Sequence, residues 1–143
     1  MKDEKKAKKQ PKLATSFATT RSRRELETAE DYVELIADLV QSKKEARTCD
    51  IAAHLGVSHV TVIRTIRRLQ QKGYLLSQPN RAIVLSQLGK DLAIFAKNRH
   101  DLVLRYLLFI GVPEEIAIID AEGIEHHMSE QTLNAIRLQL SKS

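Results

Sequence analysis

The sequence predicts a mainly α-helical protein, with a winged helix-turn-helix unit over residues 29–86 and an all-helical region over residues 87–143. Three observations lead to this prediction. Apolar residues recur with a helical period from Tyr32 onward, two short helical runs lie on either side of a turn at Gly56, and two short apolar runs follow them. The remainder of the chain again has helical periodicity between residues that typically start or end helices.

Composition is ordinary for a globular protein, but its positive charge is unevenly distributed. The chain has 143 residues, which suffices for one domain or for two small ones that share a core. The net charge is +5, and residues 1–12 account for +4 of it, since they contain six lysines and two acidic residues. Any basic nucleic-acid-binding face elsewhere must therefore come from local clustering.

Cysteine and apolar content indicate a reducing, aqueous compartment. Cys49 is the only cysteine, which excludes an internal disulfide. No apolar segment follows the basic N-terminus as it would in a signal peptide, and the longest apolar stretch, residues 102–112, is far too short to cross a membrane. We expect a cytoplasmic protein without a membrane partner.

The N-terminal residues 1–28 are rich in Lys and then in Ser, Thr and Arg without an apolar period, so we expect a basic disordered tail. Order is expected to begin near Glu30, with a helix whose apolar residues recur at steps of three and four. This apolar face consists of Tyr32, Leu35, Ile36, Leu39 and Val40.

Two short helices with a tight turn between them form the predicted helix-turn-helix. Thr48 is expected to cap the first helix, and Gly56 suits its C-terminal end. Ser58 is a good N-cap for the second helix, which is expected over residues 59–72.

A short hairpin is expected after the second helix and would complete a winged helix. Gly73 should end that helix, and residues 74–77 and 82–85 should form strands around a turn at Pro79 and Asn80.

Capping residues divide the C-terminal region into helices. Ser86 should cap a helical stretch over residues 87–110, expected as two helices bent near Asn98. Pro113 suits the first position of the next helix, and Ser129 should cap the last one.

The second helix of the helix-turn-helix is predicted to read DNA. Its apolar positions should point into the core, which leaves a face of Arg and Thr side chains suited to base edges and phosphates. A solvated basic helix face is the alternative, but the preceding helix-turn pattern favours DNA binding. The candidate DNA-binding residues are Ser58, His59, Thr61, Arg64, Thr65, Arg67 and Arg68, together with Arg81 in the wing.

Six oxygen and nitrogen donors lie on either side of this reading helix in the sequence. They are Asp31, Glu34, His100, Glu122, Glu125 and His126. All but the lone histidine fall in two clusters with helical spacing, so each cluster projects from one side of a helix. His127 is rotated about 140° from the first member of its cluster and is set aside as a ligand. Taken alone, each cluster is more often a solvated helix face than a metal site.

The order of these motifs resembles the diphtheria-toxin-repressor family, and most closely its manganese transport regulators. The matching motifs are Asp-Tyr-Val-Glu at 31–34, the helix-turn-helix, Asn-Arg-His at 98–100 and Glu-Gly-Ile-Glu-His-His at 122–127. The resemblance implies that the six donors converge as ligands of two Mn²⁺ ions per subunit. It places this site between a DNA-binding domain and a helical metal-binding and dimerisation domain. It further implies a homodimer that binds a palindromic operator and represses manganese uptake genes when Mn²⁺ is bound.

The donor types agree with manganese as the metal. All six candidates are carboxylates or imidazoles, and hard oxygen ligands suit Mn²⁺. By resemblance, Asp31 and Glu122 stand where iron-responsive relatives place sulfur-bearing residues. Cys49 is distant in sequence from every candidate ligand, and we interpret it as structural.

Two other functions are open on the sequence. One is a winged-helix regulator that responds to another divalent metal such as Fe²⁺, or to a non-metal signal. The other is a di-metal hydrolase that uses the same carboxylates and histidines, which also needs an open metal position and a substrate pocket. Since no further motif indicates either, we expect no enzymatic activity and no small organic substrate.

Overall fold

The structure consists mostly of helices, as the sequence predicts. The computed structural model describes residues 13–76 and 83–142. Its elements are α1 (Leu13–Lys43), α2 (Thr48–Leu55), α3 (His59–Gln71), β1 (Leu75–Leu76), β2 (Val84–Leu85), α4 (Gln87–Phe109), α5 (Glu114–Ile124), the 3₁₀ helix η1 (Glu125–His127) and α6 (Glu130–Ser141). None of the described helices is long and apolar enough to cross a membrane.

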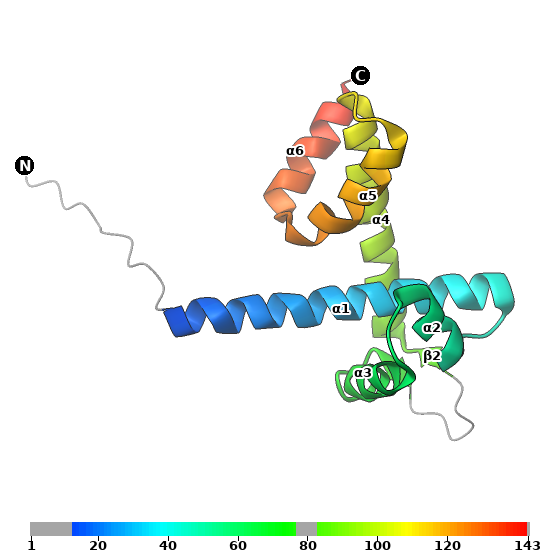
Figure 1. The fold of residues 1–143 in the computed structure, drawn as a ribbon. Helices are drawn as coiled ribbons and strands as arrows, with labels where there is room; N and C mark the ends of the chain where they lie inside the picture. Colours follow the sequence, from blue (N-terminus) through cyan, green and yellow to red (C-terminus); the bar gives the residue numbers. More distant parts are fainter. Residues whose placement is uncertain (1–12, 77–82, 143) are drawn as a thin grey trace, which may run out of the picture.

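Two hydrophobic cores, connected by α4, organise the molecule (Figure 1). The first lies among α1, α2, α3 and the strands, and Ile36 and Ile51 are fully buried in it. The second lies among α4, α5 and α6 and includes Leu133. Ala93 of α4 belongs to the first core and Val103 to the second. One continuous helix therefore joins the two parts of the molecule.

The first helix is longer than the sequence analysis predicts. Since α1 begins at Leu13, the prediction of a disordered tail is wrong for residues 13–28. These residues include neither glycine nor proline, and each residue added to an existing helix gains a hydrogen bond at little further cost. The packed part of α1 can therefore extend towards the N-terminus. Residues 1–12 lie outside the described residues.

The helix-turn-helix has the predicted residues at its turn but not at its start. Gly56 follows α2 with a φ of 65°, the left-handed conformation that glycine adopts freely. Ser58 Oγ accepts a hydrogen bond from the Thr61 amide at 3.2 Å and caps α3. The predicted capping role of Thr48 is wrong, because Thr48 is already the first residue of α2 and Arg47 is its N-cap.

The two strands form a small antiparallel sheet in which Leu75 lies opposite Leu85. The start of α4 packs tightly against this sheet at Gly89. A Cβ atom at this position would lie 2.1 Å from the Tyr74 carbonyl oxygen, so the approach requires glycine. The predicted turn between the strands, including Arg81, lies outside the described residues.

Helix α4 is continuous over 23 residues, so the predicted division into two helices near Asn98 is wrong. Asn98 is exposed, and asparagine at an exposed helical position lowers helix stability only modestly. Ala96, Arg99 and Val103 are buried along one side of the same helix. Packing along this side keeps the helix unbroken past Asn98.

The remaining caps mostly follow the predictions. Ser86 accepts a hydrogen bond from the amide of Gly89, and Ser129 accepts one from the amide of Thr132. Pro113 is the N-cap of α5 and not its first residue, a difference of one position.

Candidate metal centre and DNA-reading helix

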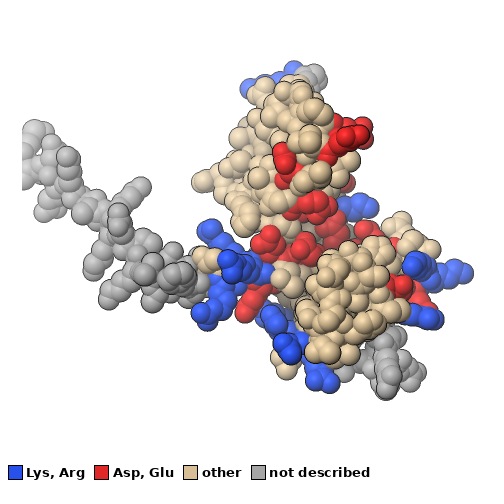
Figure 2. Space-filling view, in the orientation of Figure 1, with Lys and Arg blue, Asp and Glu red and all other residues tan. Residues whose placement is uncertain are grey.

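The six candidate metal ligands meet where the two parts of the molecule join. Figure 2 shows acidic side chains gathered at this junction. By element, α1 contributes Asp31 and Glu34, α4 contributes His100, α5 contributes Glu122, and η1 contributes Glu125 and His126.

Three of the donors form a compact group. One donor atom each of His100, Glu122 and Glu125 lies within 4.8 Å of the others. His100 Nδ1 is 3.1 Å from Glu125 Oε2 and 3.7 Å from Glu122 Oε1. His100 Nδ1 and Glu125 Oε2 are both buried without a hydrogen-bond partner. Because a buried polar atom without a partner is costly, these two atoms fit the requirement for a bound cation.

His126 connects this group to α1. Its Nε2 atom is 3.2 Å from Asp31 Oδ1 and 3.5 Å from Glu125 Oε1. Glu34 lines a pocket of about 470 Å³ together with Asp31, Glu122 and His126. The structure thus brings all six candidates to one place, while their role as ligands stays a prediction.

A buried ion pair beside His126 is not predicted by the sequence patterns. Glu30 pairs with Arg99, and the two residues are 3% and 7% exposed. His126 Nδ1 lies 3.0 Å from Glu30 Oε2 and 3.1 Å from Arg99 Nη2. Since an ionised carboxylate only accepts hydrogen bonds, Nδ1–H donates to Glu30 Oε2, and Nε2 is left facing Asp31. Carboxylates commonly orient metal-binding histidines in this way.

The position of Glu30 offers a signal that sequence reasoning can use. Glu30 is three residues before the fully buried Val33, so it lies on the side of α1 that faces the core. An acidic residue on a buried helix side requires a charged or hydrogen-bonding partner. Nothing in the spacing identifies Arg99 as that partner.

Burial and neighbouring charges shift the pKa values in the site. Burial raises the pKa of Glu125 to about 7, and burial also raises the pKa of Glu34. Hydrogen bonds to Asp31 and Glu30 raise the pKa of His126 to about 10. Burial would raise the pKa of Glu30 as well, but its bonds to His126 and Arg99 lower it overall. The site therefore holds protons that a metal must displace.

Helix α3 has an exposed basic face that carries most of the predicted DNA-binding residues. The exposed members are Ser58, His59, Thr61, Arg64, Arg67 and Arg68. The prediction that Thr65 faces outward is wrong, because Thr65 is buried and its hydroxyl donates to the Thr61 carbonyl at 2.9 Å. Thr65 follows Arg64 by 100° of helical rotation, which turns it towards the buried side of Val62.

Two apolar residues, which the sequence analysis does not single out, share this outer face. Val60 and Ile63 are 63% and 45% exposed. They line a shallow pocket with Arg64, Arg67 and Gln71, among others. Their positions outside the buried stripe of α3 are the signal that could identify them. Exposed apolar groups on such a face can contact thymine methyl groups.

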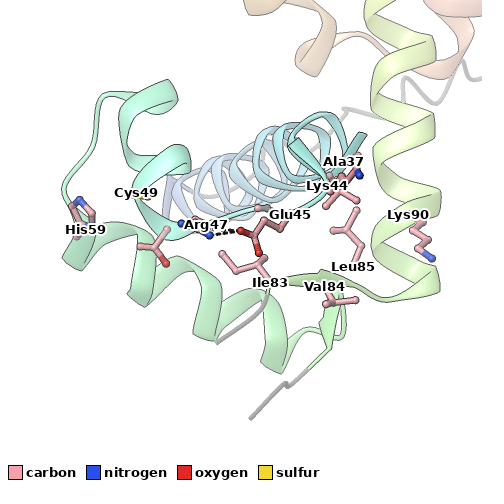
Figure 3. A pocket seen from close by; sticks show the side chains of 13 residues that line it. Ala37, Lys44, Glu45, Arg47, Cys49, His59, Ile83, Val84, Leu85 and Lys90 are labelled. Carbon is pink, nitrogen blue, oxygen red and sulfur yellow. Dashed lines mark hydrogen bonds and ion pairs between the residues drawn. The ribbon is translucent and has the colours of Figure 1, made fainter. Parts of the chain in front are cut away.

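A mostly apolar pocket of about 910 Å³ lies away from the metal candidates, between the end of α1, the start of α2 and β2 (Figure 3). Its one carboxylate, Glu45, accepts a hydrogen bond from Arg47 at 2.7 Å. This lining does not offer the several oxygen ligands that a hard cation needs. Cys49 is exposed at this pocket, whose lining includes none of the six candidate ligands, and its interpretation as a structural residue stays a prediction.

Comparison with known proteins identifies the family. A family model described as the N-terminal DNA binding domain of iron dependent repressors matches residues 26–83. A second, described as their metal binding and dimerisation domain, matches residues 86–142. The transcriptional regulator MntR of Escherichia coli O157:H7 is 45% identical over 88% of this chain and 81% of that protein. The chain belongs to the iron-dependent repressor family. This membership confirms the resemblance drawn from the order of the motifs.

Other members of the iron-dependent repressor family are similar over most of the chain. The HTH-type transcriptional regulator MntR of Bacillus subtilis (strain 168) is 38% identical over 75% of each protein. A solved manganese-dependent transcriptional repressor in complex with manganese has a TM-score of 0.70 and 27% identity, over 78% of this chain and 52% of that one. IdeR of T. acidophilum has a TM-score of 0.67 and 26% identity, over 78% and 53%. The chain thus spans about half the length of these solved relatives.

The two family matches divide the candidate ligands between them. Asp31 and Glu34 lie in the part matched by the DNA-binding domain, and the other four candidates lie in the part matched by the metal binding and dimerisation domain. Metal bound by residues of both groups would therefore connect the two parts of this member of the iron-dependent repressor family.

Proposed function

We propose that this chain is a manganese-dependent DNA-binding transcriptional regulator that represses manganese uptake genes when Mn²⁺ is bound. The observation that carries the proposal is the meeting of six oxygen and nitrogen donors from both family domains at one junction. The regulator acts as a homodimer on a palindromic operator, in which each subunit reads one half-site.

The chemistry of the donor set supports manganese. The pocket that contains Asp31, Glu34, Glu122 and His126 is lined by neither cysteine nor methionine. Carboxylates and imidazoles suit Mn²⁺, whereas sulfur ligands favour softer metals. The relatives named MntR and the solved manganese-dependent repressor agree with this choice. The description of the family as iron dependent keeps Fe²⁺ as the second candidate.

The arrangement around Glu125 supports two ions per subunit. Its Oε2 atom faces His100 Nδ1 at 3.1 Å, while its Oε1 atom faces His126 Nε2 at 3.5 Å. One carboxylate placed between two histidines can serve two neighbouring ions. We expect a metal titration of the protein to saturate at two Mn²⁺ per subunit, and saturation at one would contradict this part of the proposal.

Charge at the junction explains how the metal would act. When ionised, Asp31, Glu34, Glu122 and Glu125 repel one another across the boundary between α1 and the elements that follow α3. A bound divalent cation supplies the positive charge that offsets this repulsion. With the repulsion removed, α1 is held against α4 and η1, and α3 takes a fixed orientation. A dimer reads half-sites about 34–36 Å apart or a multiple of that distance. When the α3 helices of the two subunits are held at this spacing, the dimer binds the operator more tightly.

Operator binding across a series of metals tests the proposal. A palindromic duplex, enriched from a random pool by the Mn²⁺-loaded protein, serves as the operator. Its affinity is measured at fixed salt with Mn²⁺, Fe²⁺, Co²⁺ and Zn²⁺ and in a chelator. We expect the tightest binding with Mn²⁺ at matched free metal. Tighter binding with Fe²⁺ would favour the iron candidate, and equal affinity in the chelator would rule out a metal switch.

A further inference from the structure

We propose that the N-terminal extension of α1, residues 13–25, is a second DNA-contacting element, in which Arg21 and Arg24 bind backbone phosphates beside those reached by α3. This extension precedes the family match, which begins at residue 26. The inference rests on the proposed DNA-binding function and adds an interaction surface to it.

The extension is held beside the reading helix. Residues 13–25 continue the same helix that carries Asp31 and Glu34, so they extend from the junction over about 20 Å. Glu25 on this extension pairs with Lys72, which follows α3, at 3.0 Å. This ion pair joins residues that are 47 positions apart in the sequence. It places one side of the extension next to the C-terminal end of α3.

That side of the extension is basic. Arg21, Arg24 and Glu25 fall within about 100° of helical rotation, and both arginines are exposed. Among the residues that the structure describes, no ion pair within 4.0 Å holds either guanidinium. The pKa of Glu25 is lowered by its bond to Lys72, and the nearby charges of Arg68 and Arg21 add to this effect.

Basic side chains of the extension and of α3 lie near one another. Figure 2 shows basic side chains on the N-terminal part of α1 and close by on α3. Lys72, at the end of α3, pairs with Glu25, and the charge of Arg68 is near enough to Glu25 to lower the pKa of that carboxyl, while Arg67 is exposed on α3. A duplex whose major groove receives α3 presents its phosphates on both sides of that groove. The extension thus offers guanidinium groups, the preferred partners of phosphate, where the backbone continues.

The salt dependence of DNA binding tests this surface. The variant Arg21→Gln/Arg24→Gln keeps good helix formers at exposed positions and removes two cations per subunit. Each lost phosphate contact should reduce the slope of log affinity against log salt by about 0.9, so the dimer should lose about 3.6. Affinity for a non-palindromic duplex should fall by the same factor as affinity for the operator, because phosphates carry no sequence information.

A matched variant, Arg23→Gln/Lys142→Gln, loses the same charge elsewhere. Arg23 lies about 200° round the helix from Arg21, and Lys142 is at the opposite end of the chain. Both variants should bind Mn²⁺ with wild-type stoichiometry and unfold at the wild-type temperature. We expect the control to keep the wild-type salt slope.

Three outcomes would overturn the inference. It falls if Arg21→Gln/Arg24→Gln keeps the wild-type slope, or if the control loses as much slope, which would indicate a general effect of net charge. In both cases metal-dependent operator binding by the wild type leaves the proposed function standing. If the wild type binds no DNA with any metal, the proposed function and this inference fall together.

Discussion

Glu125 couples pH to the stability of the metal-free protein, because it is a carboxylate with 1% exposure and a pKa raised from 4.5 to about 7 by burial. A raised pKa in the folded state means that folding favours the protonated form. The resulting stabilisation is complete below a pH of about 4.5 and is lost as the pH rises through 7. The raised pKa of His126 has the same sign, but its stabilisation is lost only towards pH 10.

We predict that Glu125→Gln makes the metal-free protein more stable than the wild type at about pH 8, by roughly 2 kcal/mol, since glutamine buries no charge. The same variant should show little change in stability between about pH 5 and pH 7.5, where the wild type weakens. Urea unfolding in a chelator measures both effects. Glu114→Gln, at an exposed glutamate, is the control. Parallel pH curves for wild type and Glu125→Gln would contradict the prediction.

Glu30 and Arg99 are expected to support the metal site without binding the metal. Replacing one alone would leave a buried charge without its partner, so we choose Glu30→Gln/Arg99→Gln. We predict that this double variant weakens Mn²⁺ binding by about 10–100-fold, because the variant lacks the Glu30 carboxylate that accepts a hydrogen bond from His126 and orients its ring. Isothermal titration with Mn²⁺ measures the affinity, and circular dichroism shows whether the helices persist. Wild-type affinity in the folded variant would show that the pair serves the fold alone.

At the scale of elements, α3 carries both a buried residue that supports the fold and exposed residues that can contact DNA. Thr65 is buried and bonds to Thr61, whereas Arg64 is exposed. We predict that Thr65→Val leaves operator affinity nearly unchanged and alters stability by less than about 1 kcal/mol. Arg64→Gln should weaken operator binding by about 1–3 kcal/mol and relax specificity at one base pair. Competition binding on the operator compares them, and equal losses would contradict the assignment.

Local rules predict the elements best where a single residue decides the outcome. Ser58, Ser86 and Ser129 each cap the helix that they precede, as expected from their side chains. Local rules do not predict the start of α1 or the continuity of α4. Both depend on how far packing extends a helix through residues that neither favour nor prevent helix formation. Asn98 permits a bend, but the buried side of α4 opposes one.

In the candidate site too, local rules predict some features and long-range packing decides the others. Helical rotation separates His126 from His127, and in the structure the side chain of His126 is 5% exposed while that of His127 is 59% exposed. Helical spacing does not predict that donors far apart in the sequence meet at one site. That prediction comes from the family resemblance. The pair of Glu30 and Arg99 could not be predicted, because the partner of a buried charge is set by how α1 and α4 cross.

At the scale of the whole molecule, the candidate site lies where α1 meets the elements that form the second core. Helix α4 belongs to both cores, while α1 packs only in the first (Figure 1). The polar contacts through which α1 meets α4 and η1 are the pair of Glu30 with Arg99 and the contacts of His126 with Glu30 and Asp31. Under the proposed function, the orientation of the reading helix depends on the charge state of this junction.

Coupling between metal and DNA binding must be reciprocal if the metal acts by fixing this orientation. We predict that Mn²⁺ raises operator affinity by a factor equivalent to about 1–3 kcal/mol, and that operator DNA raises Mn²⁺ affinity by the same factor. The control is Glu114→Ala, which removes an exposed carboxylate outside the junction and should keep the coupling.

The most direct test of the metal switch is the operator affinity of the full chain at fixed salt, measured with saturating Mn²⁺ and again in a chelator. We predict binding that is about 5–150-fold tighter with Mn²⁺, and a loss of this difference in Glu122→Ala. Equal affinity under the two conditions, with Mn²⁺ shown to be bound, would contradict it.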